Sequence, residues 1–141
     1  MPMDRSFLDE TQRLFEPAMG TESAAFLLYA LARMVRLRNL LEVGLGYSTS
    51  FLALALRDAR EECEADCALL SAGEREDQRR LMLIPPYFER DYRPCLHAID
   101  DFSRTDSSAL RVVEVLETLR LDHFLRFHKR RFPRLFEAAR R

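Results

Sequence analysis

Apolar residues in the first 38 positions recur with the 3.6-residue period of α-helices. A first helix is predicted over residues 4–16, where the apolar residues that share one face are Phe7, Leu8, Leu14 and Phe15. Pro17 and Gly20 end this helix. A second helix is predicted from Thr21, and its apolar residues at helical spacing are Leu27, Leu31, Met34 and Val35. Two helices therefore precede the first predicted strand.

The central pattern of the chain is a strand, a tight turn and a helix. Leu40–Val43 is a short apolar run with Glu42 as its polar member, which is typical of a buried strand in a parallel sheet. Gly44 and Gly46 follow, and glycine permits positive φ and leaves room for a ligand. A helix is predicted from Ser48 to about residue 62. Its free N–H groups and dipole face the turn, so this unit predicts a cradle for a small nucleotide-like molecule.

A second strand is predicted at Cys95–Ile99, and it is followed by Asp100 and Asp101. An acid at this place accepts hydrogen bonds from ribose hydroxyls in nucleotide-binding α/β folds. Such an acid normally lies about 20 residues after the glycine turn, whereas Asp100 lies 54 residues after Gly46. An alternative register makes residues 67–70 the second strand, with Glu74 as the acid.

The long spacing indicates an inserted segment, residues 62–94. It contains a charged, helix-compatible stretch and then a proline-punctuated stretch with the aromatic residues Tyr87, Phe88 and Tyr92. Two interpretations remain open: a lid over a ligand, in which these rings shield a cation, and a surface excursion whose aromatic residues anchor it in the core.

The last part of the chain predicts a helix and a third strand. The helix starts at residues 106–108, and its apolar stripe is Val112, Val113, Leu116 and Leu119. The strand is Phe124–Phe127. The fold class expected is α/β, a Rossmann-like three-layer α/β/α arrangement with a partial parallel sheet, helices on both faces and N-terminal helices before the first strand. We expect a single domain over residues 1–141, divided into 1–38, 39–61, 62–94 and 95–141.

Composition narrows the function classes. The chain has 141 residues with a formal net charge of -1, which favours neither nucleic acid nor an anionic membrane surface as a partner. Its apolar runs are shorter than the 18 or more residues of a membrane span, and the N-terminus lacks a signal-peptide pattern. A cytoplasmic location is expected. The three cysteines, Cys63, Cys67 and Cys95, form no C-x-x-C pair, and no metal site is predicted.

The segment Glu42-Val43-Gly44-Leu45-Gly46-Tyr47-Ser48-Thr49 resembles motif I of the class I S-adenosylmethionine-dependent methyltransferases, in the form found in small-molecule O-methyltransferases. Thr49 stands where a dinucleotide-binding turn has its third glycine, which disfavours NAD or FAD. The resemblance implies S-adenosylmethionine as cofactor. Its expected contacts are Glu42, Gly44 and Gly46, with Tyr47 and Ser48 beside them, Asp100 on the ribose and Asp101 as the second candidate.

The resemblance covers roughly residues 21–132 and the N-terminal half of the family's fold. It implies methyl transfer to a small-molecule acceptor, and no residue is identified as a catalytic base. The alternatives are a non-catalytic cofactor-binding module or subunit, and a lyase or cyclase that uses the same cofactor. Because three parallel strands leave Leu40–Val43 at an open edge, we expect a homo-oligomer, completion by a missing C-terminal half, or coverage by residues 62–94.

Overall fold

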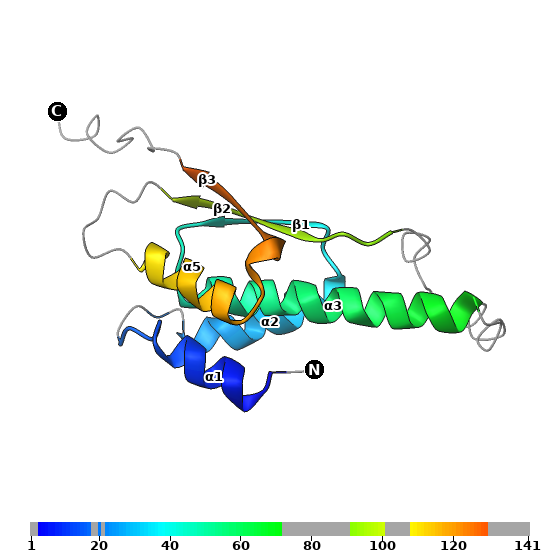
Figure 1. Ribbon diagram of the computed structural model, residues 1–141, viewed down its shortest axis with the longest axis horizontal. Coiled ribbons are helices and arrows are strands. Elements are labelled where there is room, and N and C mark those ends of the chain that lie inside the picture. The colour runs from blue at the N-terminus through cyan, green and yellow to red at the C-terminus, as the bar shows by residue number, and fades with distance from the viewer. Residues whose placement is uncertain (1–2, 18–19, 21, 72–90, 101–107, 130–141) are drawn as a thin grey trace.

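The computed structural model of the protein describes residues 3–17, 20, 22–71, 91–100 and 108–129. Within this part the chain is a mixed α/β protein with a parallel three-stranded sheet packed on helices (Figure 1). The elements in chain order are α1 (Arg5–Gln12), α2 (Glu22–Val35), β1 (Asn39–Val43), α3 (Tyr47–Ser71), β2 (Cys95–Asp100), α5 (Ala109–Thr118), the 3-10 helix η2 (Asp122–Phe124) and β3 (Leu125–Lys129).

The two helices expected before the first strand are confirmed as α1 and α2. Their ends differ from the predicted ones, and α2 packs through a different face. Asp4 caps α1, because its carboxylate accepts a hydrogen bond from the Phe7 backbone N–H at 2.9 Å. This bond keeps the pKa of Asp4 below its ordinary value. The side chains that α2 buries are Ala25, Tyr29 and Ala32. The larger apolar side chains of α2 point outward instead.

The sheet has the strand order β1-β2-β3, with β1 at one edge of the described sheet as expected. Leu40 pairs with Leu96 and Leu96 with Leu125, and all three face the helices. Leu41 and Val43 point to the opposite face, where each side chain is 67% exposed.

All described helices lie on one face of the sheet (Figure 1). The described residues therefore form two layers, and the second helical layer expected from the sequence is not among them. The reason is topological. The crossover helices α3 and α5 connect neighbouring strands in the same direction across the sheet, and right-handed crossovers in one direction place their helices on one face.

Helix α3 is longer than its periodicity predicted, since it continues past Glu62 to Ser71. Residues 67–70 are helical, so the alternative register that made them the second strand is wrong. The segment after Glu62 contains neither glycine nor proline up to Ser71, and nothing local ends the helix. An ion pair also holds it from the residue that follows α2, because Arg36 contacts Asp66 at 2.8 Å.

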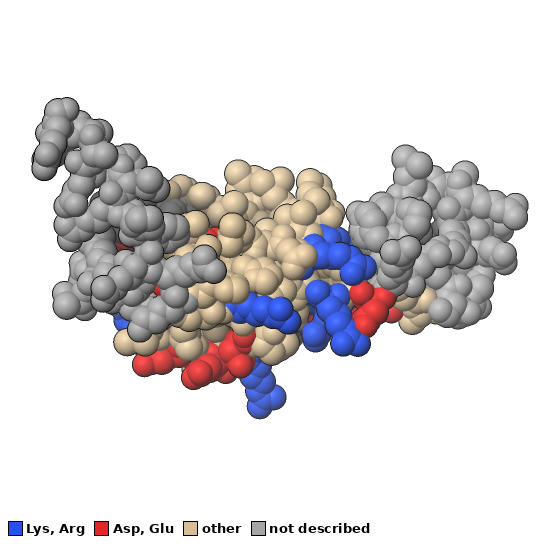
Figure 2. Space-filling view, turned by 90° about the horizontal axis from the view of Figure 1, so that it is seen from above, with Lys and Arg blue, Asp and Glu red and all other residues tan. Residues whose placement is uncertain are grey.

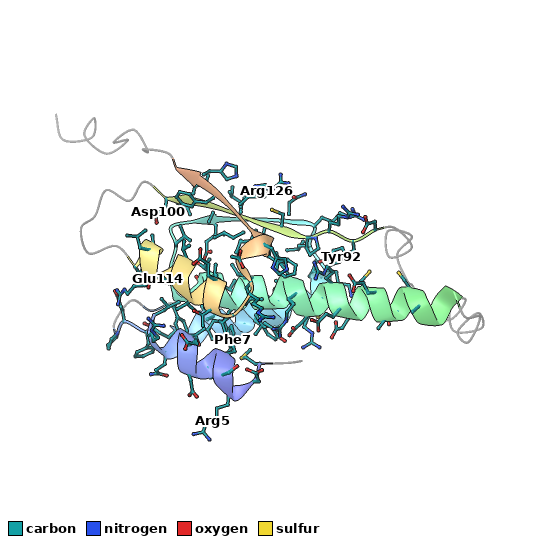
Figure 3. The ribbon with its side chains drawn as sticks, viewed as in Figure 1. Arg5, Phe7, Tyr92, Asp100, Glu114 and Arg126 are labelled. Carbon is teal, nitrogen blue, oxygen red and sulfur yellow. The ribbon has the colours of Figure 1, made fainter. Side chains whose placement is uncertain are left out.

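The core lies between α3, α5 and the helix-facing side of the sheet. Its largest fully buried side chains include Phe51, Leu54, Leu56, Leu96, Val112, Leu116, Leu121 and Phe124. Helix α5 confirms the predicted burial of Val112 and Leu116, while Val115 takes the buried place expected for Val113. Figure 3 shows side chains of these helices directed toward the sheet. This packing fixes the carboxyl ends of β1 and β2 beside the first turn of α3.

Candidate functional site at the glycine turn

The turn between β1 and α3 has the conformation expected at one of its two glycines. Gly44 adopts φ +87°, a left-handed conformation that side chains other than glycine rarely take. Gly46 does not have a positive φ, so the expectation for this residue is wrong. A Cβ atom built on either glycine meets nothing within 4 Å. Space over both glycines is therefore open to a ligand.

The backbone N–H groups of the turn are already used inside the protein. Gly44 N–H donates to the Ile99 carbonyl at 2.8 Å, Leu45 N–H to Asp100 Oδ2 at 3.1 Å, and Gly46 N–H to Thr49 Oγ1 at 3.0 Å. Phosphate-binding turns instead direct such groups at the ligand. These three N–H groups are therefore not free to bind a ligand.

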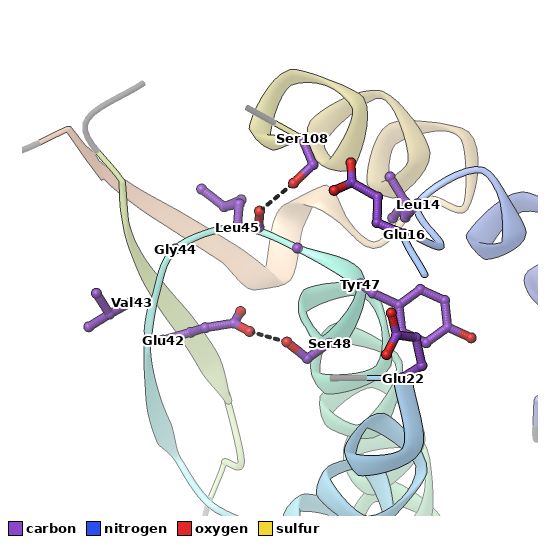
Figure 4. Close-up of a pocket in the computed structure, with 11 residues that line it drawn as sticks. Leu14, Glu16, Glu22, Glu42, Val43, Gly44, Leu45, Tyr47, Ser48 and Ser108 are labelled. Carbon is purple, nitrogen blue, oxygen red and sulfur yellow. Dashed lines mark hydrogen bonds between the residues drawn. The ribbon is translucent and has the colours of Figure 1, made fainter. Parts of the chain in front are cut away.

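A cavity of about 170 Å³ opens at this turn (Figure 4). It lies at the carboxyl end of β1, the usual place for ligands in open α/β sheets. The residues that line it are Leu14, Glu16, Glu22, Glu42, Val43, Gly44, Leu45, Gly46, Tyr47, Ser48 and Ser108. Five of the seven predicted site residues are thus brought together at one cavity.

Glu42 is the chemically most unusual residue of the cavity. Ser48 Oγ donates a hydrogen bond to Glu42 Oε1 at 2.6 Å (Figure 4). The other oxygen, Oε2, is buried, and no described residue donates a hydrogen bond to it. Burial raises the pKa of Glu42, and the hydroxyl groups of Ser48 and Thr49 partly oppose this shift. A hydrogen-bond donor or a positive charge in the cavity would stabilise the buried Glu42 carboxylate.

Two more carboxylates line the cavity, from the segment after α1 and from the first turn of α2. Glu22 also has a buried oxygen, Oε1, that lacks a hydrogen-bond partner in the described structure. Glu16 pairs with Arg111 at 2.7 Å. No lysine or arginine belongs to the described lining residues. The cavity therefore favours a cationic ligand group over an anionic one.

The tyrosine at the start of α3 forms the apolar wall of the cavity. The Tyr47 ring packs against Phe51 with 4.9 Å between ring centroids and against Phe15 with 6.0 Å. Burial, and the negative charge of Glu22, raise the pKa of its hydroxyl group. A fixed, neutral aromatic ring beside carboxylates is a suitable surface for an organic cation.

Asp100 and Ser108 fix the turn through hydrogen bonds to Leu45, the residue between the two glycines. Asp100 does not line the cavity, but its carboxylate accepts the Leu45 N–H described above. Ser108 Oγ donates to the Leu45 carbonyl at 2.9 Å (Figure 4). Both polar groups of Leu45 are thereby fixed by residues at the end of β2 and the start of α5.

The remaining predictions for the site have different outcomes. Asp101, Glu74, Tyr87 and Phe88 lie outside the described residues. Tyr92 is buried, and its hydroxyl group donates to the Leu37 carbonyl at 2.9 Å. Of the two interpretations left open for these aromatic residues, the core anchor therefore holds for Tyr92.

Sequence reasoning missed Glu16, Glu22 and Ser108. The two glutamates belong to the N-terminal helical region, and only the fold brings them beside β1. Ser108 is the N-cap residue of α5, yet its hydroxyl group makes no capping bond and donates to the Leu45 carbonyl instead. None of the three belongs to a motif that the sequence alone could have revealed.

Three further observations limit the class of site. In the described segments, no group of three or more His, Cys, Asp or Glu side chains is arranged to hold a metal ion. No described helix is long and apolar enough to cross a membrane. Comparisons with protein-family models, with curated proteins and with solved structures found no match to this chain.

Proposed function

We propose that the protein binds S-adenosylmethionine at the glycine turn and transfers its methyl group to a small molecule. The observation that supports this most is the acidic cavity at the carboxyl end of β1, where Glu42 and Glu22 each have a buried oxygen to which no described residue donates a hydrogen bond. S-adenosylmethionine carries an ammonium and a sulfonium group and one carboxylate, so its net charge is positive. Carboxylate oxygens such as these stabilise its two cationic groups.

The same cavity argues against a dinucleotide. A pyrophosphate group brings negative charge, and it would meet three glutamates without a lysine or arginine among the described lining residues. The N–H groups of residues 44–46, which would otherwise bind phosphate, are occupied. These contacts support the proposal in addition to Thr49, which replaces the third glycine of the dinucleotide pattern.

The fold is compatible with this function. The strand order, read from the other edge, is β3-β2-β1, as in one half of a doubly wound Rossmann-like sheet. In such sheets the ligand lies beyond the carboxyl end of the first strand, at the point where the strand order reverses. The cavity occupies that place.

Within the proposal each residue has a separate role. Glu42, with Ser48 bonded to it, would bind the amino acid end of the cofactor, and Gly46 would let the cofactor pass close to the backbone. Asp100 would orient the turn and face the ribose side. The cavity volume is below the range of about 300–1,000 Å³ for drug-sized ligands, so the described walls account for only part of the cofactor.

The cofactor supplies a methyl group that is already activated as a sulfonium. The protein then has to align the acceptor and exclude water, which requires little acid–base chemistry. We assign no catalytic base. Leu14, Leu45 and Tyr47 supply apolar surface that would keep water from the reacting centre.

Equilibrium dialysis with methyl-labelled cofactor, followed by product analysis, tests the proposal. Wild-type protein and Glu117→Gln, an exposed control on α5, should retain the label. Glu42→Gln should bind about tenfold or more weakly, because a charge-assisted interaction contributes about 1.5–3 kcal/mol. Label in a methylated acceptor indicates transfer, whereas label in a cleavage product supports a lyase. Equal binding by all three proteins would contradict the role of the acidic cavity.

A further inference from the structure

Helix α2 exposes its large apolar side chains instead of burying them. The side chains on its outward face are exposed to 60% at Leu27, 43% at Leu31, 74% at Met34 and 48% at Val35. The opposite side of the helix, with Ala25 and Ala32, packs on α3. Residues 23–32 contain no charged residue. An apolar helix face of this kind is normally covered by another structural element.

Strand β1 has an open edge beside this helix. Arg38 C=O and Gly44 N–H bond to β2 at 2.8 Å each. In a parallel ladder every second residue directs its N–H and C=O groups at the neighbouring strand. The N–H and C=O groups of Asn39, Leu41 and Val43 therefore point away from β2, toward the edge. Among described strands, β1 pairs only with β2. The edge residues include no proline and no charge, which are the usual means of preventing edge pairing.

The two open surfaces lie on the same side of the molecule. The sheet runs β1-β2-β3, and the helices beneath it run α2, α3, α5, because α3 contacts both α2 and α5. Among the described helices, α2 is therefore the outermost one on the β1 side. Figure 2 looks onto the sheet face that no described helix covers. The central part of this face is mostly uncharged where the structure describes it.

We propose that a second copy of this chain docks on the joint surface of α2 and β1 through a two-fold axis perpendicular to the sheet. Such an axis pairs β1 with its counterpart in antiparallel orientation about Leu41, and it keeps both helical layers on the same side. Asn39 then faces Val43 of the second copy. All three outward-pointing backbone pairs obtain partners, and a continuous six-stranded sheet results.

The same axis brings the two α2 helices together. Val35 leads toward Asn39 and Glu22 lies at the cavity with Val43, so α2 runs antiparallel to β1 and its middle is level with Leu41. A two-fold axis there places Leu27 of one copy opposite Leu31 of the other. One operation covers both the helix face and the strand edge, which is the self-complementarity that a two-fold interface requires.

The size of this surface fits a dimer. The exposed side chains of α2 present apolar area on the order of 500 Å², comparable with the largest patch on a typical monomer. Strand pairing extends this toward the roughly 800 Å² per partner of a standard interface. Val43 belongs both to this interface and to the lining of the glycine-turn cavity, whereas the α2 positions substituted below do not line the cavity.

Sedimentation velocity across the micromolar range tests the proposal with charge-swap variants. Wild-type protein should sediment as a dimer. Leu27→Lys and Leu31→Glu should each weaken dimerisation at least tenfold, because each places a charge in the apolar contact. An equimolar mixture of the two variants should dimerise again, since the new lysine faces the new glutamate across the axis.

Leu110→Lys is the matched control, because Leu110 is 67% exposed on α5, away from this surface. This variant should remain a dimer. Circular dichroism confirms that each variant keeps its helices, as expected for substitutions at exposed positions. A wild-type monomer, dimers that persist in both α2 variants, or a mixture that stays monomeric would each overturn the proposed interface.

Discussion

Glu42 is the residue of the cavity whose environment is least favourable for the stability of the fold. Its side chain projects from β1, and one carboxylate oxygen accepts a hydrogen bond while the other, which is buried, has no donor among the described residues. An unsatisfied buried acceptor destabilises a fold. Residues of this kind are common at functional sites, where binding requires a group that folding alone would not favour.

Replacing Glu42 with glutamine is expected to stabilise the protein at neutral pH. Burial raises the pKa of Glu42 above 4.5, so the folded state binds more protons than the unfolded state between pH 4.5 and the raised pKa. The contribution of Glu42 to stability therefore falls as the pH rises through this window. The melting temperature of Glu42→Gln should exceed that of the wild type at pH 7, and the difference should shrink toward pH 4.5. A difference in melting temperature that does not change with pH would show that the raised pKa of Glu42 is not its cause.

Alanine substitutions should separate the two glycines of the turn. Gly44→Ala places a side chain at φ +87° and should lower the free energy of unfolding by about 1–2 kcal/mol. Gly46→Ala lacks this strain and meets no neighbouring atom, so its effect should stay within about 0.5 kcal/mol. Urea denaturation measures both. Equal destabilisation by the two variants would show that their different backbone conformations do not matter.

A valine at position 46 tests whether the ligand occupies the space over Gly46. It adds no backbone strain, because Gly46 does not have a positive φ. Gly46→Val should fold, because an added Cβ meets nothing within 4 Å. The branched side chain would occupy the cavity opening and should reduce cofactor binding at least tenfold in equilibrium dialysis. Unchanged affinity would indicate that the ligand does not cross Gly46.

At the scale of elements, the sequence predicted every described strand, with β1 and β2 correct to within one residue at each end and β3 to within two. Short apolar runs bounded by polar or glycine residues have few alternative structures. Helices were less certain. Periodicity identified α2 but could not tell which side faces the core, since α2 is apolar around most of its circumference. Its orientation depends on small residues and on polar contacts with α3 that only the folded chain forms. Likewise, Glu16 and Glu22 became site residues only through tertiary packing.

The polar contact between α2 and α3 is expected to contribute measurably to stability. Tyr29 donates to Asp58 Oδ2 at 2.7 Å and accepts from Arg33 at 2.8 Å, and Asp58 is only 4% exposed. Tyr29→Phe removes both bonds and should cost about 1–3 kcal/mol, with Arg57 still paired to the buried carboxylate. Urea denaturation of Tyr29→Phe, Asp58→Asn and the double variant measures the coupling. Strict additivity would contradict a direct interaction.

At the scale of the whole molecule, the described residues form a two-layer unit with one strand edge and one sheet face uncovered. The strand order is compatible with one half of a doubly wound sheet, and the cavity lies at the carboxyl end of β1. This arrangement explains why β1 is apolar although it lies at an edge. The proposed dimer places β1 in the middle of a six-stranded sheet.

The central claim is that the cavity at the glycine turn accepts a cationic adenosyl cofactor rather than a dinucleotide. The most direct measurement is isothermal titration calorimetry of the full chain with S-adenosylmethionine and, separately, with NAD at the same ionic strength. The acidic lining predicts a binding isotherm with S-adenosylmethionine, which weakens in Glu42→Gln, and no heat of binding with NAD. Binding of NAD without any response to S-adenosylmethionine would contradict the account.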